Sequence, residues 1–279
     1  MAAAERIVAT ILGCGSSGGV PRVGNVWGDC DPENPRNRRR RCALLLTGTS
    51  VGSDAATQII IDTGCDIREQ MLDARVNHAD AVFYTHEHAD HTHGIDDLRV
   101  LALNNRKRVD VYHSREAGER LREAFGYCFR APAGSDYPPI LNAHDIEPGD
   151  EVVIDGPGGS IAVQAFAQEH GSILSLGYRV GGFAYSCDLS GIPEASLPAV
   201  SDLDVWIIDA LRPFPHPSHL SLPESLALIA AQKPRQAILT NLHIDMDYAH
   251  VAATTPSNVA PAFDGMQIDV TAGRIIGAL

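Results

Sequence analysis

The run His86-Glu87-His88-Ala89-Asp90-His91 decides how this sequence is interpreted. It places four side chains that can bind a metal within six residues, directly after the apolar segment Ala81–Tyr84, which is typical of a buried β-strand. Neutral imidazole and carboxylate groups suit divalent ions such as zinc, manganese or iron. His86 and His88 can point the same way from an extended turn, while Asp90 and His91 lie further along, so one loop can serve two adjacent metals. The run therefore predicts a metal centre.

Short β-rich segments alternate with helical patterns on both sides of this run. The expected strands are Ile7–Leu12, Ala43–Thr47, Gln58–Ile61, Ala81–Tyr84, Glu151–Ile154, Ile161–Gln168, Leu174–Val180, Phe183–Ser186, Asp204–Ile208, Gln236–Thr240 and Met266–Val270. The expected helices are Asp66–Ala74, Ile95–Leu103, Arg115–Phe125, Leu222–Ala231 and Tyr248–Ala253. Gly13–Arg41 and Phe129–His144 are expected to be long surface loops. Because no Ser/Gly linker divides the chain, residues 1–279 are expected to form one α/β domain.

The composition limits the classes of function. The chain has 279 residues, of which 44% are hydrophobic and 20% charged, with a net charge of −13. This acidity disfavours extended contact with nucleic acid, but it allows a small anionic substrate, since bound divalent metals reverse the local charge. Six scattered cysteines favour reduced thiols over a disulfide framework. With no secretory pattern and no apolar run long enough for a membrane, we expect a cytoplasmic protein that has no membrane partner.

The run HEHADH resembles the HxHxDH motif of the metallo-β-lactamase superfamily. The other family ligands are matched in order by Asp62, His170, Asp188 and His243. The opening Gly13–Arg22 looks like the GxGxxxGVP start, and Asp264-Gly265-Met266 like the closing DGM, of one branch of that superfamily. This branch contains tRNase Z and the PhnP-like phosphoribosyl cyclic phosphodiesterases. The resemblance implies a metallo-β-lactamase αββα sandwich, in which two mixed β-sheets are flanked by helices.

The resemblance also implies a role for each matching residue. Two divalent metal ions, zinc or manganese, would hold a bridging hydroxide that attacks phosphorus, and Asp90 would count among the catalytic residues. Asp62 would orient a ligand by accepting an imidazole N–H. The implied ligands are His86, His88 and His170 for one metal, Asp90, His91 and His243 for the other, and Asp188 as the bridge.

Two positions leave alternatives open. His219 lies where the family places a histidine that protonates the leaving group, and an imidazole titrates close to the working pH; His216 is the rival candidate. Asn241 stands where the phosphoribosyl enzymes have their final metal histidine. We expect His243 to replace that ligand, because residues two apart in an extended segment share a face, with Asn241 supporting the ligands from behind.

The cysteines depart from the family pattern. The phosphoribosyl enzymes carry a cysteine cluster for a structural zinc, whereas this early loop has only Cys30, and Ile244 stands where a histidine partner would lie. One thiol cannot make a closed four-ligand site, so no structural zinc is expected. Cys187, next to Asp188, is expected to be a small buried hydrophobe rather than a nucleophile.

Several features are weaker candidates for substrate contact. Gly13–Gly19 lacks the helix and the acidic residue of a dinucleotide site, so its Ser16 and Ser17 predict either an anion-binding turn or a purely structural one. His216 and Arg99 are further candidates, and Arg212 is a similar one. The basic run of residues 36–41 either contacts phosphate or is a solvated surface.

The leading hypothesis is a metal-dependent hydrolase, a phosphodiesterase that acts on a small cyclic or nucleotide-like phosphodiester. The expected partner is this phosphorylated molecule, and the chain could form a homodimer. One alternative is tRNA 3′ processing, which the charge and the lack of a clear Gly/Pro-rich arm disfavour. A non-catalytic nucleotide- or metal-binding module is another, disfavoured by the nearly complete ligand set.

Overall fold

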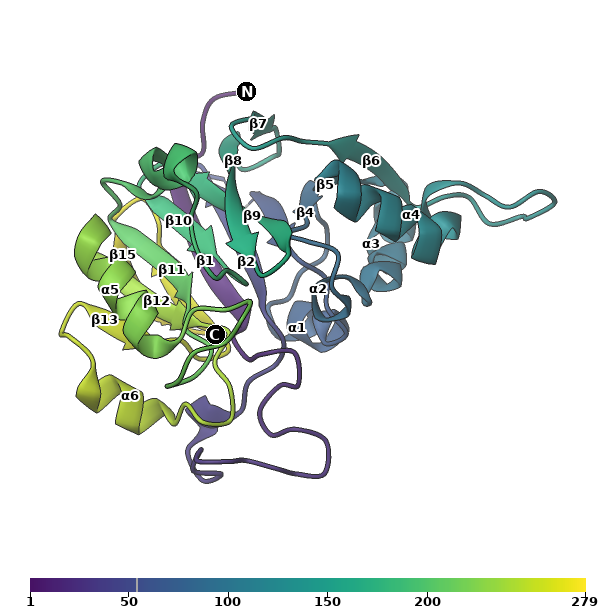
Figure 1. Ribbon diagram of the computed structural model, residues 1–279. Helices are drawn as coiled ribbons and strands as arrows, with labels where there is room; N and C mark the ends of the chain where they lie inside the picture. Colours follow the sequence, from purple (N-terminus) through teal and green to yellow (C-terminus); the bar gives the residue numbers. More distant parts are fainter. Residues whose placement is uncertain (54) are drawn as a thin grey trace.

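Two β-sheets form the centre of the protein in a computed structural model that describes residues 1–53 and 55–279 (Figure 1). Each sheet is antiparallel on one side and parallel on the other. The eight-stranded sheet has the order β15 (Arg274–Ala278), β14 (Met266–Asp269), β1 (Arg6–Gly13), β2 (Ala43–Thr49), β3 (Ala56–Ile61), β4 (Ala81–Phe83), β5 (Val109–His113) and β6 (Leu141–Asp145). The seven-stranded sheet has the order β13 (Val259–Pro261), β12 (Gln236–Thr240), β11 (Val205–Asp209), β10 (Phe183–Ser186), β9 (Ile173–Val180), β8 (Ile161–His170) and β7 (Glu151–Ile154).

Helices cover the outer face of each sheet (Figure 1). The first sheet is covered by α1 (Ile67–Asp73), α3 (Leu98–Asn105) and α4 (Arg115–Phe129), and the second by α5 (Leu222–Gln232) and α6 (Tyr248–Thr254). The short helix α2 (Ala89–Thr92) lies within the HEHADH loop. Short 3-10 helices span Pro35–Asn37, Ile95–Asp97 and Glu194–Val200.

Three apolar layers hold these four layers of structure together, and strand alternation explains them. In β2, Leu44 and Leu46 pack between the two sheets, whereas Leu45 packs outward beneath the helices. In β11, Ile207 points inward, and Trp206 packs on the side of α5 and α6. Because both faces of these strands are buried, their sequences are continuous apolar runs rather than alternating ones. The predicted αββα sandwich of two mixed sheets is confirmed.

The prediction was wrong for part of the first sheet. It omitted β5, and it treated Phe129–His144 as loop, although β6 begins at Leu141. Polar pairing explains the error, because Asn142 and His144 of this edge strand bond to Asp110 of β5 at 3.1 and 2.9 Å. An edge strand needs only one buried face, so its sequence resembles a polar loop. The short strands β13 and β15 were also missed.

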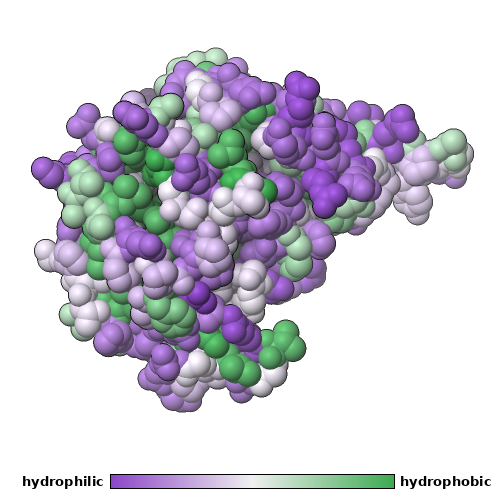
Figure 2. All heavy atoms as spheres, viewed as in Figure 1, coloured by the Kyte–Doolittle hydropathy of each residue, from purple (hydrophilic) through white to green (hydrophobic). Residues whose placement is uncertain are grey.

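The surface is mixed in polarity. Hydrophilic atoms, drawn in purple, predominate over α4, where Figure 2 shows the same face as Figure 1. Within the described residues, no helix is both long and apolar enough to cross a membrane.

Candidate metal centre and active site

The predicted ligands meet where several strands end, so the fold gathers residues that are far apart in the sequence. Asp62 follows β3, His86 lies three residues beyond β4, and His170 ends β8. Asp188 follows β10 and Asn241 follows β12. The loops that leave neighbouring strands thus place their side chains around one point.

Three of these residues adopt a left-handed backbone conformation that is uncommon outside glycine. The φ angles are 65° at Asp62, 55° at Asp188 and 60° at Asn241. Each such residue costs on the order of 1–3 kcal/mol, and residues of this kind cluster at active sites. Here the conformation turns the chain sharply at the end of each strand. The site therefore stores strain that the surrounding sheets maintain.

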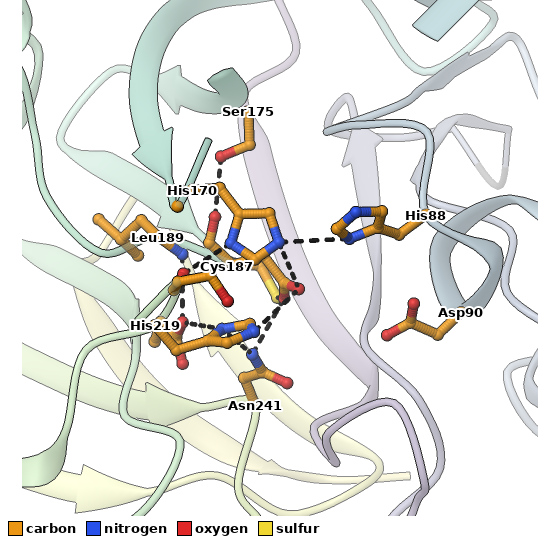
Figure 3. Close-up of polar contacts among 12 residues, drawn as sticks. His88, Asp90, His170, Ser175, Cys187, Leu189, His219 and Asn241 are labelled. Carbon is orange, nitrogen blue, oxygen red and sulfur yellow. Dashed lines mark hydrogen bonds and ion pairs between the residues drawn. The ribbon is translucent and has the colours of Figure 1, made fainter. Parts of the chain in front are cut away.

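Four side chains form a first ligand group. One ligand atom from each of His86, His88, His170 and Asp188 lies within 4.8 Å of all the others. Asp188 Oδ2 is 3.7 Å from His86 Nε2 and 3.8 Å from His170 Nε2. Four ligands placed 2.1 Å from one ion in a tetrahedron are about 3.4 Å apart, so the spacing fits a divalent metal. In Figure 3, His170 and His88 point toward one another.

The protonation states of this group also suit a metal. Burial lowers the pKa of both His86 and His170, so their rings stay neutral at neutral pH. His170 Nδ1 donates to the carbonyl oxygen of Ser218 at 2.6 Å, which leaves Nε2 with a free lone pair. Burial would raise the pKa of Asp188, but the rings of His91 and His86 outweigh it and hold that pKa well below its usual range.

His91, Cys187 and Asp188 form a second group beside the first, with one ligand atom of each within 4.8 Å of the others, and Asp90 lies next to His91. His91 Nε2 is 3.4 Å from both Asp90 Oδ2 and Asp188 Oδ1. Its Nδ1 lies 2.7 Å from Asp62 Oδ2, which is the arrangement that orients a metal-binding imidazole. Burial would lower the pKa of His91, yet the carboxylates of Asp188, Asp62 and Asp90 raise it well above its usual value. The surroundings thus favour a positive charge at this point, and a bound cation would supply one.

The backbone holds the HEHADH loop close to the segment that follows Asp62. The amide of Thr63 donates to the carbonyl of His91 at 2.7 Å, and that of Gly94 donates to Thr63 at 2.8 Å. A Cβ atom on Gly64 would lie only 1.9 Å from the carbonyl oxygen of Asp90. Only glycine allows this approach, which positions Asp90 over the cluster.

The cysteines near the site are buried. Cys187 is fully buried, with its sulfur 3.0 Å from Asp188 Oδ1, and burial raises the pKa of this thiol well above its usual value. The thiol therefore stays neutral in this environment. Cys30, the cysteine of the early loop, lies 3.8 Å from the guanidinium of Arg39.

The prediction for His243 requires a correction. It assumed an extended backbone, but Asn241 has a left-handed conformation, which breaks the alternation on which the prediction rested. Asn241 Nδ2 donates to Asp188 Oδ1 at 3.0 Å, beside the ligands. His243 instead lies against Arg22 and Asp245, and its Nδ1 is 2.7 Å from Asp245 Oδ2. It faces the same cavity but is outside both ligand groups.

His219 lies beside the ligands and is oriented by a carboxylate that the sequence analysis missed. Its Nδ1 is 2.8 Å from Asp209 Oδ2, and its Nε2 is 4.0 Å from Asp188 Oδ2. Burial raises the pKa of Asp209 to about 6. Burial would lower the pKa of His219, but the hydrogen bond and charge of Asp209 outweigh it and raise that pKa. A signal existed, because Asp209 ends an apolar strand much as Asp62 follows one.

A cavity of about 170 Å³ opens over the ligands. The cavity is lined by the predicted residues Ser16, Ser17, His216 and His219. Figure 3 shows His219 beside Asn241. The residues lining the cavity are Ser16, Ser17, Arg22, Asp90, Asp188, Leu211, Arg212, His216, His219, Asn241 and His243. Arg22 and Leu211 were not predicted.

Arg99, a candidate for substrate contact, does not line this cavity, and neither does the basic run, for which phosphate contact was one of two alternatives. Arg99 pairs with Asp96 at 2.7 Å and faces Tyr127, in a separate hollow. In the basic run, Arg40 pairs with Asp264 and Asp73, Arg41 pairs with Asp66, and Arg36 stacks on Tyr248 and Phe263. These arginines hold the early loop to the body of the protein.

Comparison with known proteins places this site in a family. The family model described as a beta-lactamase superfamily domain matches residues 57–244. A crystal structure described as a new diphosphatase from the PhnP family has a TM-score of 0.81 and 30% identity, covering 95% of this chain and 97% of that one.

Two curated proteins are also similar. An octanoyltransferase of Porphyromonas gingivalis is 29% identical over 262 residues, which is 92% of this chain and 50% of that protein. A ribonuclease Z of Methanopyrus kandleri is 27% identical over 130 residues, covering 45% of this chain and 40% of that protein. The chain thus spans half or less of the length of these curated relatives. With its matching model, its αββα layers and its His/Asp cluster, the chain belongs to the beta-lactamase superfamily, as a PhnP-like hydrolase of the metallo-β-lactamase fold.

Proposed function

We propose that this protein is a phosphodiesterase that hydrolyses a small phosphorylated or nucleotide-like molecule with two divalent metals. The observation that carries the proposal is the His219–Asp209 pair beside the ligand groups, 4.0 Å from Asp188. An ester oxygen leaves poorly as an alkoxide, so its departure needs a proton donor at this position. The cluster of ligands alone would support many kinds of hydrolysis.

His86, His88, His170 and Asp188 would hold one metal, and Asp90, His91 and Asp188 the other. When bound, such ions supply an acidified water and neutralise charge that develops on phosphoryl oxygens. With His243 outside the cluster, the second position is surrounded by the imidazole of His91, the carboxylates of Asp90 and Asp188, and the thiol of Cys187.

His219 is placed to deliver a proton. Asp209 fixes the ring by accepting from Nδ1, so Nε2 faces the cavity and its proton can pass to the leaving oxygen. The raised pKa keeps this ring protonated over a wider range of pH. His216 lies 5.0 Å from it, measured between ring centroids, and its pKa is lowered by burial and by His219, so it is the weaker candidate for the acid.

The relatives support this reading in part. The diphosphatase of the PhnP family shows that a protein of this fold at 30% identity can act on a phosphorus centre. The similarity to ribonuclease Z supports tRNA processing as a second candidate, but a net charge of −13 disfavours binding to a long polyanion. Octanoyl transfer is not carried over, because this chain matches only half of the protein that has that name.

Turnover of bis(p-nitrophenyl) phosphate tests the proposal. The metal-loaded protein is expected to release p-nitrophenolate, and a chelator or His88→Ala is expected to abolish the reaction. His250→Ala is the matched control, since His250 is exposed on α6, away from the cavity. A metal-loaded protein that is inert towards cyclic and linear phosphodiesters would refute the proposal, and binding of nucleotides without turnover would favour a non-catalytic module.

A further inference from the structure

Two arginines line the same cavity as the metal ligands Asp90 and Asp188. Arg22 comes from the early loop, and its guanidinium contacts the ring nitrogen Nε2 of His243. Asp245 holds the other ring nitrogen at 2.7 Å, so an Asp245–His243 relay orients Arg22. Arg212 comes from the loop after β11 and donates to the carbonyl oxygens of Phe214 and Pro215 at 3.2 and 2.7 Å.

Neither guanidinium is paired with a carboxylate of the residues that the structure describes. Within the described part of the chain, no Asp or Glu oxygen forms an ion pair with Arg22 or Arg212, whereas Arg40 and Arg41 are both paired. In a protein with a net charge of −13, these two guanidinium groups bring positive charge into the cavity that Asp90 and Asp188 also line. They favour a ligand that is itself an anion.

A third, independent feature lies in the same cavity. Ser16 is almost fully buried, and its hydroxyl has no hydrogen-bond partner among the described residues. An unsatisfied buried hydroxyl is costly, and an acceptor oxygen from a ligand would satisfy it. The arginines and this hydroxyl are the donor types that bind phosphoryl oxygens.

The size of the cavity limits what these donors can bind. At about 170 Å³ it is smaller than the roughly 300–1,000 Å³ of pockets that enclose a whole small molecule. It can therefore enclose the charged end of a substrate while the remainder stays outside. Because Asp90 and Asp188 line the same small space as Arg22, an anion bound to the arginine lies next to the group held by the ligands.

We propose that Arg22 and Arg212 bind a second phosphoryl group adjacent to the one that is attacked, so that the natural substrate is an ester of a diphosphate. His243 is a positioning residue for Arg22. This inference rests on the proposed function, since it concerns the substrate of the same site. In the reaction, water attacks one phosphorus atom, one P–O bond breaks, and the leaving oxygen departs as an anion or takes a proton.

Three p-nitrophenyl esters of thymidine test this inference. The first is the p-nitrophenyl ester of thymidine 5′-phosphate, and the second is the p-nitrophenyl ester of thymidine 5′-diphosphate. The third is the first ester with an added 3′-phosphate. All share one chromophore, and they differ in whether a second phosphoryl group is missing, adjacent or remote. The readout is kcat/KM for each ester, with the products separated by chromatography.

The wild-type protein is expected to prefer the diphosphate ester. Arg22→Ala should reduce the ratio of kcat/KM for the diphosphate ester to that for the monophosphate ester by about 10- to 100-fold, mainly through KM, as for a lost charged hydrogen bond. Arg22→Lys should restore part of this ratio. Arg38→Ala is the matched control, because Arg38 is exposed on the same early loop and does not line the cavity.

The outcomes separate the two proposals. An unchanged ratio in Arg22→Ala would overturn the inference. A wild-type preference for the ester with the remote 3′-phosphate would also overturn it, if Arg22→Ala reduces that preference as much as it reduces the preference for the diphosphate ester. Failure of the wild-type protein to hydrolyse any of the esters would instead refute the phosphodiesterase itself. Arg22 is exposed, so its replacement is not expected to disturb folding, and the unfolding midpoint checks this.

Discussion

The substitution Asp62→Asn tests whether this carboxylate controls the second metal position. Asp62 is fully buried and accepts three hydrogen bonds, from the amide and the hydroxyl of Thr85, each at 2.8 Å, and from Nδ1 of His91 at 2.7 Å. Asparagine has nearly the same shape but offers one acceptor oxygen and one NH₂ donor. If the oxygen stays on the Thr85 amide, the NH₂ group faces the Nδ1–H of His91.

That donor–donor contact can be relieved only if His91 moves its proton to Nε2, the nitrogen that faces Asp90 and Asp188. A protonated Nε2 has no lone pair for a metal. Reversing the amide instead places the NH₂ group against the Thr85 amide. Either way one buried donor loses its partner, at a cost of about 1–3 kcal/mol. This corresponds to roughly 5- to 150-fold in affinity, in line with the 10–100-fold typical for such partners of metal ligands.

Calorimetric titration of the metal-free protein with zinc or manganese measures the effect. One site, held by His86, His88 and His170, is expected to keep its affinity in Asp62→Asn, while the second weakens by about 10- to 100-fold. Asp66→Asn is the matched control: it removes the same charge four residues away, where the carboxylate pairs with Arg41 at 2.9 Å and touches no ligand. Two sites of wild-type affinity in Asp62→Asn would refute the tautomer argument.

Three further predictions follow from the same geometry. His219→Ala should slow the hydrolysis of an alkyl phosphodiester about 10²–10⁴-fold but that of a p-nitrophenyl ester far less, since p-nitrophenolate leaves without a proton. Equal losses of rate for the two esters would exclude His219 as the proton donor. Because Asp209 raises the pKa of His219, the acid form persists below that pKa and is lost above it, so Asp209→Asn should move the alkaline limb of kcat to lower pH. An alkaline limb that stays at the same pH in Asp209→Asn would contradict this prediction. Gly64→Ala places Cβ 1.9 Å from a carbonyl oxygen and should reduce the free energy of unfolding in urea by about 1–3 kcal/mol; an unchanged midpoint would show that the loop yields.

The residues that the sequence identified are those whose signal is local. HEHADH carries its chemistry within one loop, and Asp62 is marked by the apolar strand before it. Alternating strand and helix patterns were enough to predict one α/β domain, because buried strands and amphipathic helices have different apolar periods, whereas the two mixed sheets were implied by the resemblance of the motifs. The edge strand β6 was not predicted, because its polar side chains form hydrogen bonds with a neighbouring strand that lies about thirty residues earlier in the sequence.

Tertiary structure decided the composition of the cavity. Asn241 has a positive φ, and His243 two residues later contacts Arg22, a partner 221 residues distant in the sequence, and belongs to neither ligand group. Asp209 acquires its role only when β11 lies beside β10 and β12, which sets it against His219. Short-range patterns in the sequence determined the alternating strands and helices and the local ligand loop, because they encode burial, and the resemblance of the motifs added the fold and the more distant ligands. Which further side chains face the cavity depended on backbone turns at strand ends, and these are set by the packed sheets rather than by any local pattern.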